Sequence, residues 1–156
     1  MRGRLQVIHL KTLPVYIKAD KIIEFLNKCV AAIEMKPHGD IRLIKYDPPF
    51  DNPALFSFLA FQPLKESYIA IDTWSELEYL NIVINSCKNF NVNKAIGVAI
   101  KTFNPYLVWC GSSEIYTGEP KTKTVLYRRK RWLVYLKTFF KNLIMGDIIT
   151  KQPKTS

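Results

Sequence analysis

The chain has 156 residues, of which 48% are apolar and 23% charged, and its formal net charge is +10. This size and composition predict one globular domain with a single hydrophobic core, and the lack of any apolar run of about 18 residues excludes an ordinary transmembrane helix. Residues 121–156 carry ten basic side chains and one acidic one, whereas the rest of the chain carries 13 basic and 12 acidic ones. The body of the protein is therefore nearly neutral, which argues against nucleic-acid binding by that part.

The N-terminal part of the chain predicts an extended segment followed by a helix. Residues 4–10 and 13–17 are rich in large apolar and β-branched side chains, which favour a strand. From Asp20, a candidate N-cap, to about residue 35, apolar side chains recur every three or four positions and form one face. Glu24 and Lys28 are spaced to form a stabilising ion pair on the other face.

The middle of the chain predicts short strands separated by turns. The four strands are expected at residues 41–46, 55–62, 67–73 and 81–85. Three prolines between residues 47 and 53 indicate a loop. Ser75 and Glu78 could form a capping box and begin a helix, but the β-branched centre of residues 81–85 favours a strand there.

The last part of the domain predicts a helix and a final strand. Asn91 or Asn93 can cap a helix that runs to about Phe103, and Pro105 ends it. Residues 106–116 contain a further strand. This element order predicts an α+β two-layer sandwich with helices on one face of an antiparallel sheet, plus a C-terminal basic helix. We assign the domain to residues 1–120 and a basic amphipathic extension to residues 121–156.

The cysteines and histidines do not suggest a metal site. Cys29, Cys87 and Cys110 are widely spaced and odd in number, and His9 and His38 are isolated. We therefore expect reduced thiols and no structural metal. The N-terminus lacks the apolar run and cleavage site of a signal peptide, so we expect a cytoplasmic location.

Residues 64–87 concentrate the side chains that can perform chemistry. They include three carboxylates, a serine, an indole and a thiol, at Glu66, Ser67, Asp72, Trp74, Glu76 and Cys87. This layout resembles the pyruvoyl-dependent S-adenosylmethionine decarboxylases of the prokaryotic type. In that family a Glu-Ser-His-x-x-Ile-His-Thr-Trp-Pro-Glu segment is followed by a cysteine 20 residues after the serine, and Cys87 stands 20 residues after Ser67.

The resemblance implies that the chain makes its own cofactor. The backbone would be cut between Glu66 and Ser67, and Ser67 would become a pyruvoyl group. That group acts as an electron sink and allows an amino acid to lose its carboxylate as carbon dioxide. Cys87 would be the acid that protonates the substrate carbon afterwards.

The resemblance also implies how S-adenosylmethionine is held. Glu76 matches a carboxylate that accepts hydrogen bonds from both ribose hydroxyls, and Trp74 matches the family tryptophan. Phe50, in a Phe-x-x-Pro arrangement, matches a ring on which adenine stacks. Aromatic faces near the sulfonium would add cation–π attraction. The expected role is decarboxylation for polyamine (spermidine) biosynthesis by a homodimer.

Three positions depart from the family pattern. Asp72 replaces the histidine that removes the α-proton of the serine during processing, and Tyr68 replaces the histidine after that serine. An upstream processing serine aligns with Leu59, and Ser57 could replace it only after a two-residue shift. These departures leave two alternatives beside the self-processing enzyme. One is a pyruvoyl decarboxylase of another amino acid, and the other is a non-cleaving homologue that binds S-adenosylmethionine or a catalytic partner subunit.

The C-terminal region predicts a basic amphipathic helix. Four consecutive basic residues, 128–131, precede an aromatic and aliphatic segment that extends to Met145 and carries Lys137 and Lys141 on one face. Such a helix could pack on the domain or on a second subunit. It could also contact an anionic surface.

Overall fold

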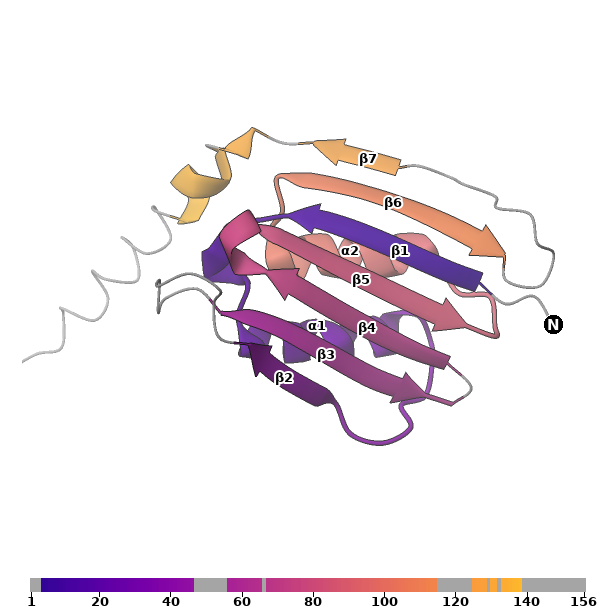
Figure 1. The fold of residues 1–156 in the computed structure, drawn as a ribbon. Helices are drawn as coiled ribbons and strands as arrows, with labels where there is room; N and C mark the ends of the chain where they lie inside the picture. Colours follow the sequence, from indigo (N-terminus) through magenta and orange to yellow (C-terminus); the bar gives the residue numbers. More distant parts are fainter. Residues whose placement is uncertain are drawn as a thin grey trace, which may run out of the picture.

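The computed structural model describes residues 4–46, 56–65, 67–114, 125–128, 130, 131 and 133–138. In this part of the chain seven strands form one antiparallel sheet with the order β2-β3-β4-β5-β1-β6-β7, and α1 and α2 lie together on one side of it (Figure 1). The predicted α+β two-layer sandwich is therefore confirmed. The elements are β1 (Arg4–Lys11), η1 (Pro14–Tyr16), α1 (Ala19–Ala32), β2 (Arg42–Tyr46), β3 (Ser57–Leu64), β4 (Ser67–Trp74), η2 (Ser75–Leu77), β5 (Tyr79–Ser86), α2 (Val92–Phe103), β6 (Leu107–Glu114) and β7 (Val125–Arg128).

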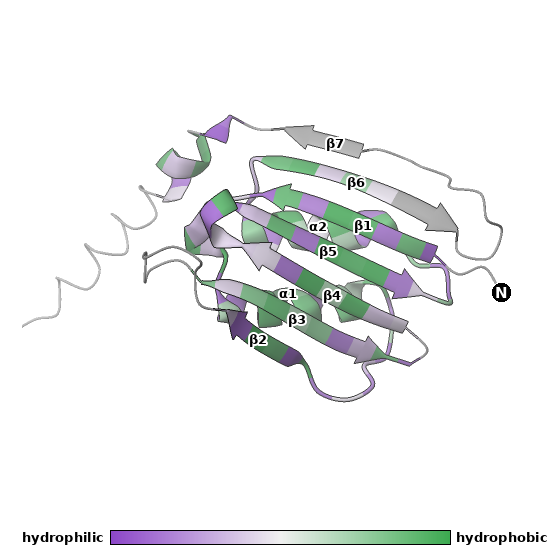
Figure 2. Cartoon of the chain, in the orientation of Figure 1, coloured by the Kyte–Doolittle hydropathy of each residue, from purple (hydrophilic) through white to green (hydrophobic). Residues whose placement is uncertain are grey.

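The hydrophobic core lies between the sheet and the two helices. In β4 the side chains of Ile69 and Ile71 are fully buried against the helices, while Ala70 between them is only half-buried. The same alternation runs along β1 and β5 and is visible as alternating colours in Figure 2. Phe25 of α1 and Phe103 of α2 meet in this layer with ring centroids 5.3 Å apart. A period of two therefore sends every second strand residue into the core.

The helix ends agree with the sequence in part. Asn91 caps α2, because its side-chain oxygen accepts a hydrogen bond from the Lys94 amide at 3.2 Å. Lys28 pairs with Glu24 at 2.6 Å, as predicted. Asp20 is not the N-cap of α1: the helix begins at Ala19, and Asp20 lies in its first turn. A carboxylate in the first turn still stabilises a helix through the helix dipole, which explains the similar signal in the sequence.

The segment at residues 13–17 forms a 3-10 turn rather than a strand. Pro14 occupies the first position of η1, where its fixed backbone angle suits a helical turn and its missing N–H costs nothing. The turn carries the chain from the sheet to α1 in the other layer. The strand that follows Ser75 and Glu78 is confirmed, and it is longer than predicted, since β5 covers Tyr79–Ser86.

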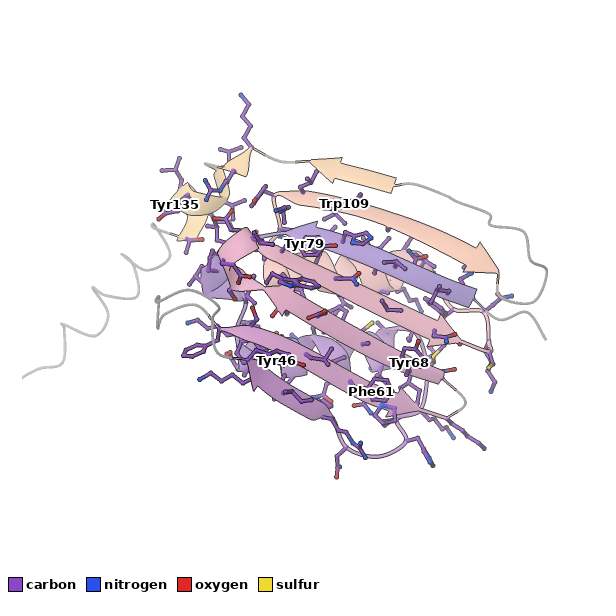
Figure 3. The ribbon with its side chains drawn as sticks, viewed as in Figure 1. Tyr46, Phe61, Tyr68, Tyr79, Trp109 and Tyr135 are labelled. Carbon is purple, nitrogen blue, oxygen red and sulfur yellow. The ribbon has the colours of Figure 1, made fainter. Side chains whose placement is uncertain are left out.

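The open face of the sheet, the side away from α1 and α2, is unusually rich in aromatic side chains. It carries alternate residues of each strand, including His9, Leu59, Phe61, Tyr68, Asp72, Trp74, Tyr79, Asn81 and Trp109. Figure 3 shows the labelled aromatic rings of this face lying in front of the sheet. Among the described residues Phe61 is 37% exposed, an unfavourable position for a phenylalanine in water.

The C-terminal region continues the fold. β7 pairs with β6 in the same sheet, and Arg131 and residues 133–138 are helical, with Val134 fully buried. The described residues thus confirm the start of the predicted basic helix, and residues 139–145 lie outside them. The division of the chain at residue 120 stays a prediction. No helix in the described part of the chain is both long and apolar enough to cross a membrane.

Candidate active site

The hairpin of β4 and β5 brings Ser67 and Cys87 together. The two strands pair along their whole length, so Ser67, the first residue of β4, lies opposite Ser86, the last residue of β5. Cys87 follows directly, and its backbone N–H donates to the Ser67 hydroxyl oxygen at 3.3 Å. The 20-residue separation seen in the sequence is therefore the length of a hairpin with two eight-residue arms and a four-residue turn.

A small hydroxyl network surrounds Ser67. Its hydroxyl lies 3.4 Å from that of Ser86, which is fully buried. The Ser86 hydroxyl donates to the carbonyl oxygen of Lys88 at 2.8 Å and accepts from the Lys88 amide at 3.0 Å. These contacts fix Ser86, and through it they hold the Ser67 hydroxyl at the end of the sheet. Cys87 is half-buried beside them.

Asp72 lies on the open face, in the middle of β4. Its neighbours across the sheet are Leu59 on β3 and Asn81 on β5. Burial raises the pKa of the Asp72 carboxyl, and a backbone hydrogen bond at Thr73 opposes the rise. A carboxylate with a raised pKa is a better base than an exposed one. Leu59 and Asp72, the positions that the resemblance aligns with the family's processing serine and histidine, are thus cross-strand neighbours.

Aromatic rings line the open face beside Asp72. Trp74 and Tyr79 face each other across the β4–β5 pair with centroids 5.3 Å apart. His9 stacks between Tyr79 and Trp109, at 5.9 Å and 5.1 Å, and its Nδ1 is hydrogen-bonded to the Tyr79 hydroxyl. Burial lowers the pKa of His9, whereas burial and the charge of Asp72 raise the pKa of Tyr79. Both shifts favour the neutral form of the group.

Asn81 adds an unsatisfied acceptor to this surface. Its position lies between Asp72 and His9 across the sheet. Its side-chain oxygen is buried and has no hydrogen-bond partner among the described residues. A buried acceptor without a donor costs about 1–3 kcal/mol, so this site favours a partner that supplies an N–H or O–H.

Glu76 lies in the η2 turn, at the opposite end of the hairpin from Ser67. The Ser57 hydroxyl donates to a Glu76 carboxylate oxygen at 3.3 Å, and the Ser75 hydroxyl donates to the carbonyl oxygen of Phe56. A cavity of about 470 Å³ opens next to this turn, and Phe56 and Phe58 form part of its wall. The turn thus offers a carboxylate beside an aromatic-walled cavity.

The predicted site residues therefore form two groups rather than one. Ser67 and Cys87 lie at one end of the hairpin, and Trp74 and Glu76 lie at the other (Figure 1). Asp72 is five residues from Ser67 along β4, which at about 3.3 Å per residue is a separation of roughly 17 Å. Phe50 and Glu66 lie outside the described residues.

Several residues of this region were not identified from the sequence. His9 has no histidine or cysteine close to it in the sequence, and Tyr79, Asn81 and Trp109 belong to no sequence motif. Side chains alternate between the two faces of a strand, and each of these residues falls on the open face of the sheet, the face that also carries Asp72. The strand order β4-β5-β1-β6, which places these residues side by side, is known only from the three-dimensional structure.

Comparisons with known proteins complete the description. The sequence model of the S-adenosylmethionine decarboxylase family matches residues 14–110, more than half of the chain. The fold is similar to the crystal structure of the adenosylmethionine decarboxylase from Aquifex aeolicus VF5, with a TM-score of 0.62 and 17% sequence identity. The alignment covers 78% of this chain and 97% of that one, and it establishes the likeness in fold. No curated protein sequence matches the chain.

Proposed function

Because the chain belongs to the S-adenosylmethionine decarboxylase family, we propose that it is a pyruvoyl-dependent decarboxylase of S-adenosylmethionine that cleaves itself between Glu66 and Ser67. The observation that supports this most strongly is the pairing of Ser67 with Cys87 at one end of the β4–β5 hairpin, where the Cys87 amide donates to the Ser67 hydroxyl. The reaction would supply aminopropyl donors for spermidine synthesis in the cytoplasm.

The surroundings of Ser67 fit a pyruvoyl group made from that residue. The serine begins a strand, and its hydroxyl oxygen, the nucleophile of the cleavage, accepts from the Cys87 N–H and faces the Ser86 hydroxyl. When formed, the group supplies the electron sink that decarboxylation requires. Cys87, half-buried next to Ser67, holds the proton that the substrate carbon receives after carbon dioxide leaves.

Substrate recognition follows from the second group of residues. Glu76 accepts the hydrogen bonds of the ribose hydroxyls, and charge-assisted hydrogen bonds of this kind are about twice as strong as neutral ones. Trp74 and Tyr79 present aromatic faces on the same surface as the carboxyl group of Asp72. A sulfonium cation is attracted to both kinds of group. The cavity of about 470 Å³ beside Phe56 and Phe58 is the proposed place of the adenine ring.

The separation of the two groups supports a homodimer as the working unit. Residues that must act on one substrate molecule lie at opposite ends of a hairpin whose arms are eight residues long. Two copies that pack their open faces antiparallel around a two-fold axis would bring the Glu76 end of one chain to the Ser67 end of its partner. Such packing would also cover Phe61.

A non-cleaving homologue is the second candidate. The cross-strand pair Leu59 and Asp72 favours it, because a leucine cannot assist the serine and a carboxylate is a weaker base than an imidazole. In that case the open face would bind S-adenosylmethionine or a catalytic partner subunit without any chemistry at Ser67. A third possibility, a pyruvoyl decarboxylase of another amino acid, rests on the altered residues Tyr68 and Asp72.

Release of labelled carbon dioxide distinguishes these functions. Purified protein should release it from S-adenosylmethionine labelled in its carboxyl group, and the Ser67→Ala variant should not. Release from a different amino acid alone would support the third possibility. Binding of S-adenosylmethionine without any release would support the non-cleaving homologue and contradict the proposal.

Mixing two inactive variants tests the shared site. Ser67→Ala and Glu76→Ala should each be inactive alone, and the mixture, after reversible unfolding, should recover roughly a quarter of the wild-type activity through mixed dimers with one intact site. No recovery from a mixture that forms dimers would place each site within a single chain.

A further inference from the structure

The turn that carries Glu76 is held by the C-terminal segment of the chain. Arg131 donates from its Nε atom to Oε2 of Glu78 at 3.0 Å and from a second nitrogen, Nη2, to Oε1 of the same carboxylate. Tyr106 donates to the same Oε2 at 2.8 Å. Glu78 therefore accepts three hydrogen bonds, two of which form a fork with one guanidinium group. This fork geometry restricts the position of a carboxylate more strongly than a single contact.

Glu78 has an unfavourable backbone conformation that these contacts stabilise. Its φ angle is 54°, in the left-handed region that residues with a side chain rarely adopt. The Thr12 amide donates to the Glu78 carbonyl at 2.9 Å, and the Glu78 amide donates to the Ser75 carbonyl at 3.1 Å. Lys11 also donates to the carbonyl of Leu77 at 2.7 Å. A strained residue persists when surrounding contacts determine its conformation, and Arg131 supplies two of them.

The segment that carries Arg131 is seated on the body of the protein. Val134 is fully buried, and the Thr138 hydroxyl lies 2.6 Å from that of Tyr16. Asn104 donates to the same tyrosine oxygen at 2.9 Å. Arg131, Val134 and Thr138 are spaced by three and four residues, so one face of the helix makes all these contacts. A cavity of about 490 Å³ remains between this helix and Leu13, Pro14 and Val15.

This arrangement links the C-terminal segment to the proposed substrate site. Glu78 follows Glu76 by two residues, and Tyr79, which faces Trp74, follows Glu78 directly. The one side-chain contact that holds the Glu76 carboxylate among the described residues is the 3.3 Å hydrogen bond from Ser57. The orientation of Glu76 therefore depends on the turn itself. Arg131 lies beyond residues 14–110, so the resemblance to the family does not account for it.

We propose that Arg131 is a positioning residue: through its pair with Glu78 it fixes the η2 turn so that Glu76 and Trp74 are set for the substrate. The effect of Arg131 on substrate binding rests on the proposed function, whereas its effect on the η2 turn does not. Tyr106 remains a protonated donor at all ordinary pH values, because burial and Glu78 raise its pKa to about 12. The pair of Arg131 with Glu78 weakens with added salt, since Arg131 is 58% exposed.

Three variants test the proposal. Arg131→Ala removes the pair, Arg131→Lys keeps the charge but loses the fork, and Lys130→Ala removes an equal charge from an exposed neighbour outside the pair. Hydrogen exchange should become faster at residues 75–79 in Arg131→Ala and stay unchanged in Lys130→Ala. The dissociation constant for S-adenosylmethionine should rise about fivefold in Arg131→Ala, the scale of one partly exposed ion pair, and less in Arg131→Lys.

The outcomes separate this inference from the proposed function. Unchanged exchange at residues 75–79 in Arg131→Ala would overturn it, and so would faster exchange with unchanged affinity for S-adenosylmethionine. If the wild-type protein did not bind S-adenosylmethionine at all, the proposed function would fail, and the exchange measurement would still decide whether Arg131 holds the turn. Circular dichroism of each variant confirms that the fold is intact.

Discussion

Replacing Asp72 by histidine should accelerate self-cleavage. Asp72→His restores an imidazole at the position that aligns with the base of the family's processing reaction. The ordinary pKa values of aspartate and histidine are about 3.9 and 6.5, and a Brønsted coefficient of about 0.5 converts this difference into a rate factor of roughly 20.

Burial on the open face makes the expected rate factor smaller. Burial raises the pKa of Asp72 and lowers that of His9, which lies in the same cross-strand row, so a histidine at position 72 would also lose basicity. The two effects narrow the difference between the bases, and we expect cleavage about 5- to 20-fold faster than in the wild type. Leu59→Ser combined with Asp72→His should be faster still, because Leu59 is the cross-strand neighbour of Asp72.

A time course of freshly synthesised protein measures this effect. The fraction of intact chain is followed on denaturing gels, and each variant is compared with Ile44→His, which places an imidazole on β2 at a residue that is 51% exposed. Cleavage by Asp72→His at the wild-type rate, or more slowly, would refute the view that residue 72 supplies the base. Acceleration by Ile44→His would show that any added imidazole suffices.

Two further predictions concern Asp72 and Glu76. Asp72→Asn should raise the melting temperature at pH 7 and leave it unchanged near pH 3. Burial raises the pKa of Asp72 in the folded protein above its value in the unfolded chain. The stability of the wild type is therefore highest below the unfolded-state pKa and falls as the pH rises through the folded-state pKa. Equal melting temperatures at pH 7 would contradict this sign. Glu76→Ala should weaken S-adenosylmethionine binding by about 100-fold or more, the scale of two charge-assisted hydrogen bonds. Calorimetric titration of variants that also carry Ser67→Ala measures this affinity. An unchanged affinity would show that Glu76 is not part of the substrate site.

The fold could be predicted from the sequence because its signals are local. Apolar and polar side chains alternate in β5, and apolar side chains recur every three or four residues in α1. These patterns specify which element forms and which of its sides is buried. Asn91 marks a helix start because its side chain satisfies a backbone amide nearby. The predicted N-cap Asp20 lies two residues after the observed N-cap, Lys18, because an acid in the first turn and an N-cap produce similar sequence signals.

The candidate site could be predicted only where its residues share one hairpin. The family resemblance relates Ser67 to Cys87 by their 20-residue spacing, and the structure places them together because the two arms of β4 and β5 have equal lengths and a short turn. The contact of His9 with Tyr79 spans 70 positions, and that of Arg131 with Glu78 spans 53. Neither has a local sequence signal. Asp72 and Ser67 are five residues apart on the same strand, and the proposed dimer accounts for their separation by combining residues of two chains.

Intact mass measured under denaturing conditions tests the central claim most directly. The proposal predicts two fragments, residues 1–66 and residues 67–156, and the second should be lighter by one ammonia than a chain that begins with serine, as conversion to a pyruvoyl group requires. A single species of 18.1 kDa would contradict self-processing at Ser67. A second fragment with an intact N-terminal serine would indicate simple hydrolysis and would contradict formation of the cofactor.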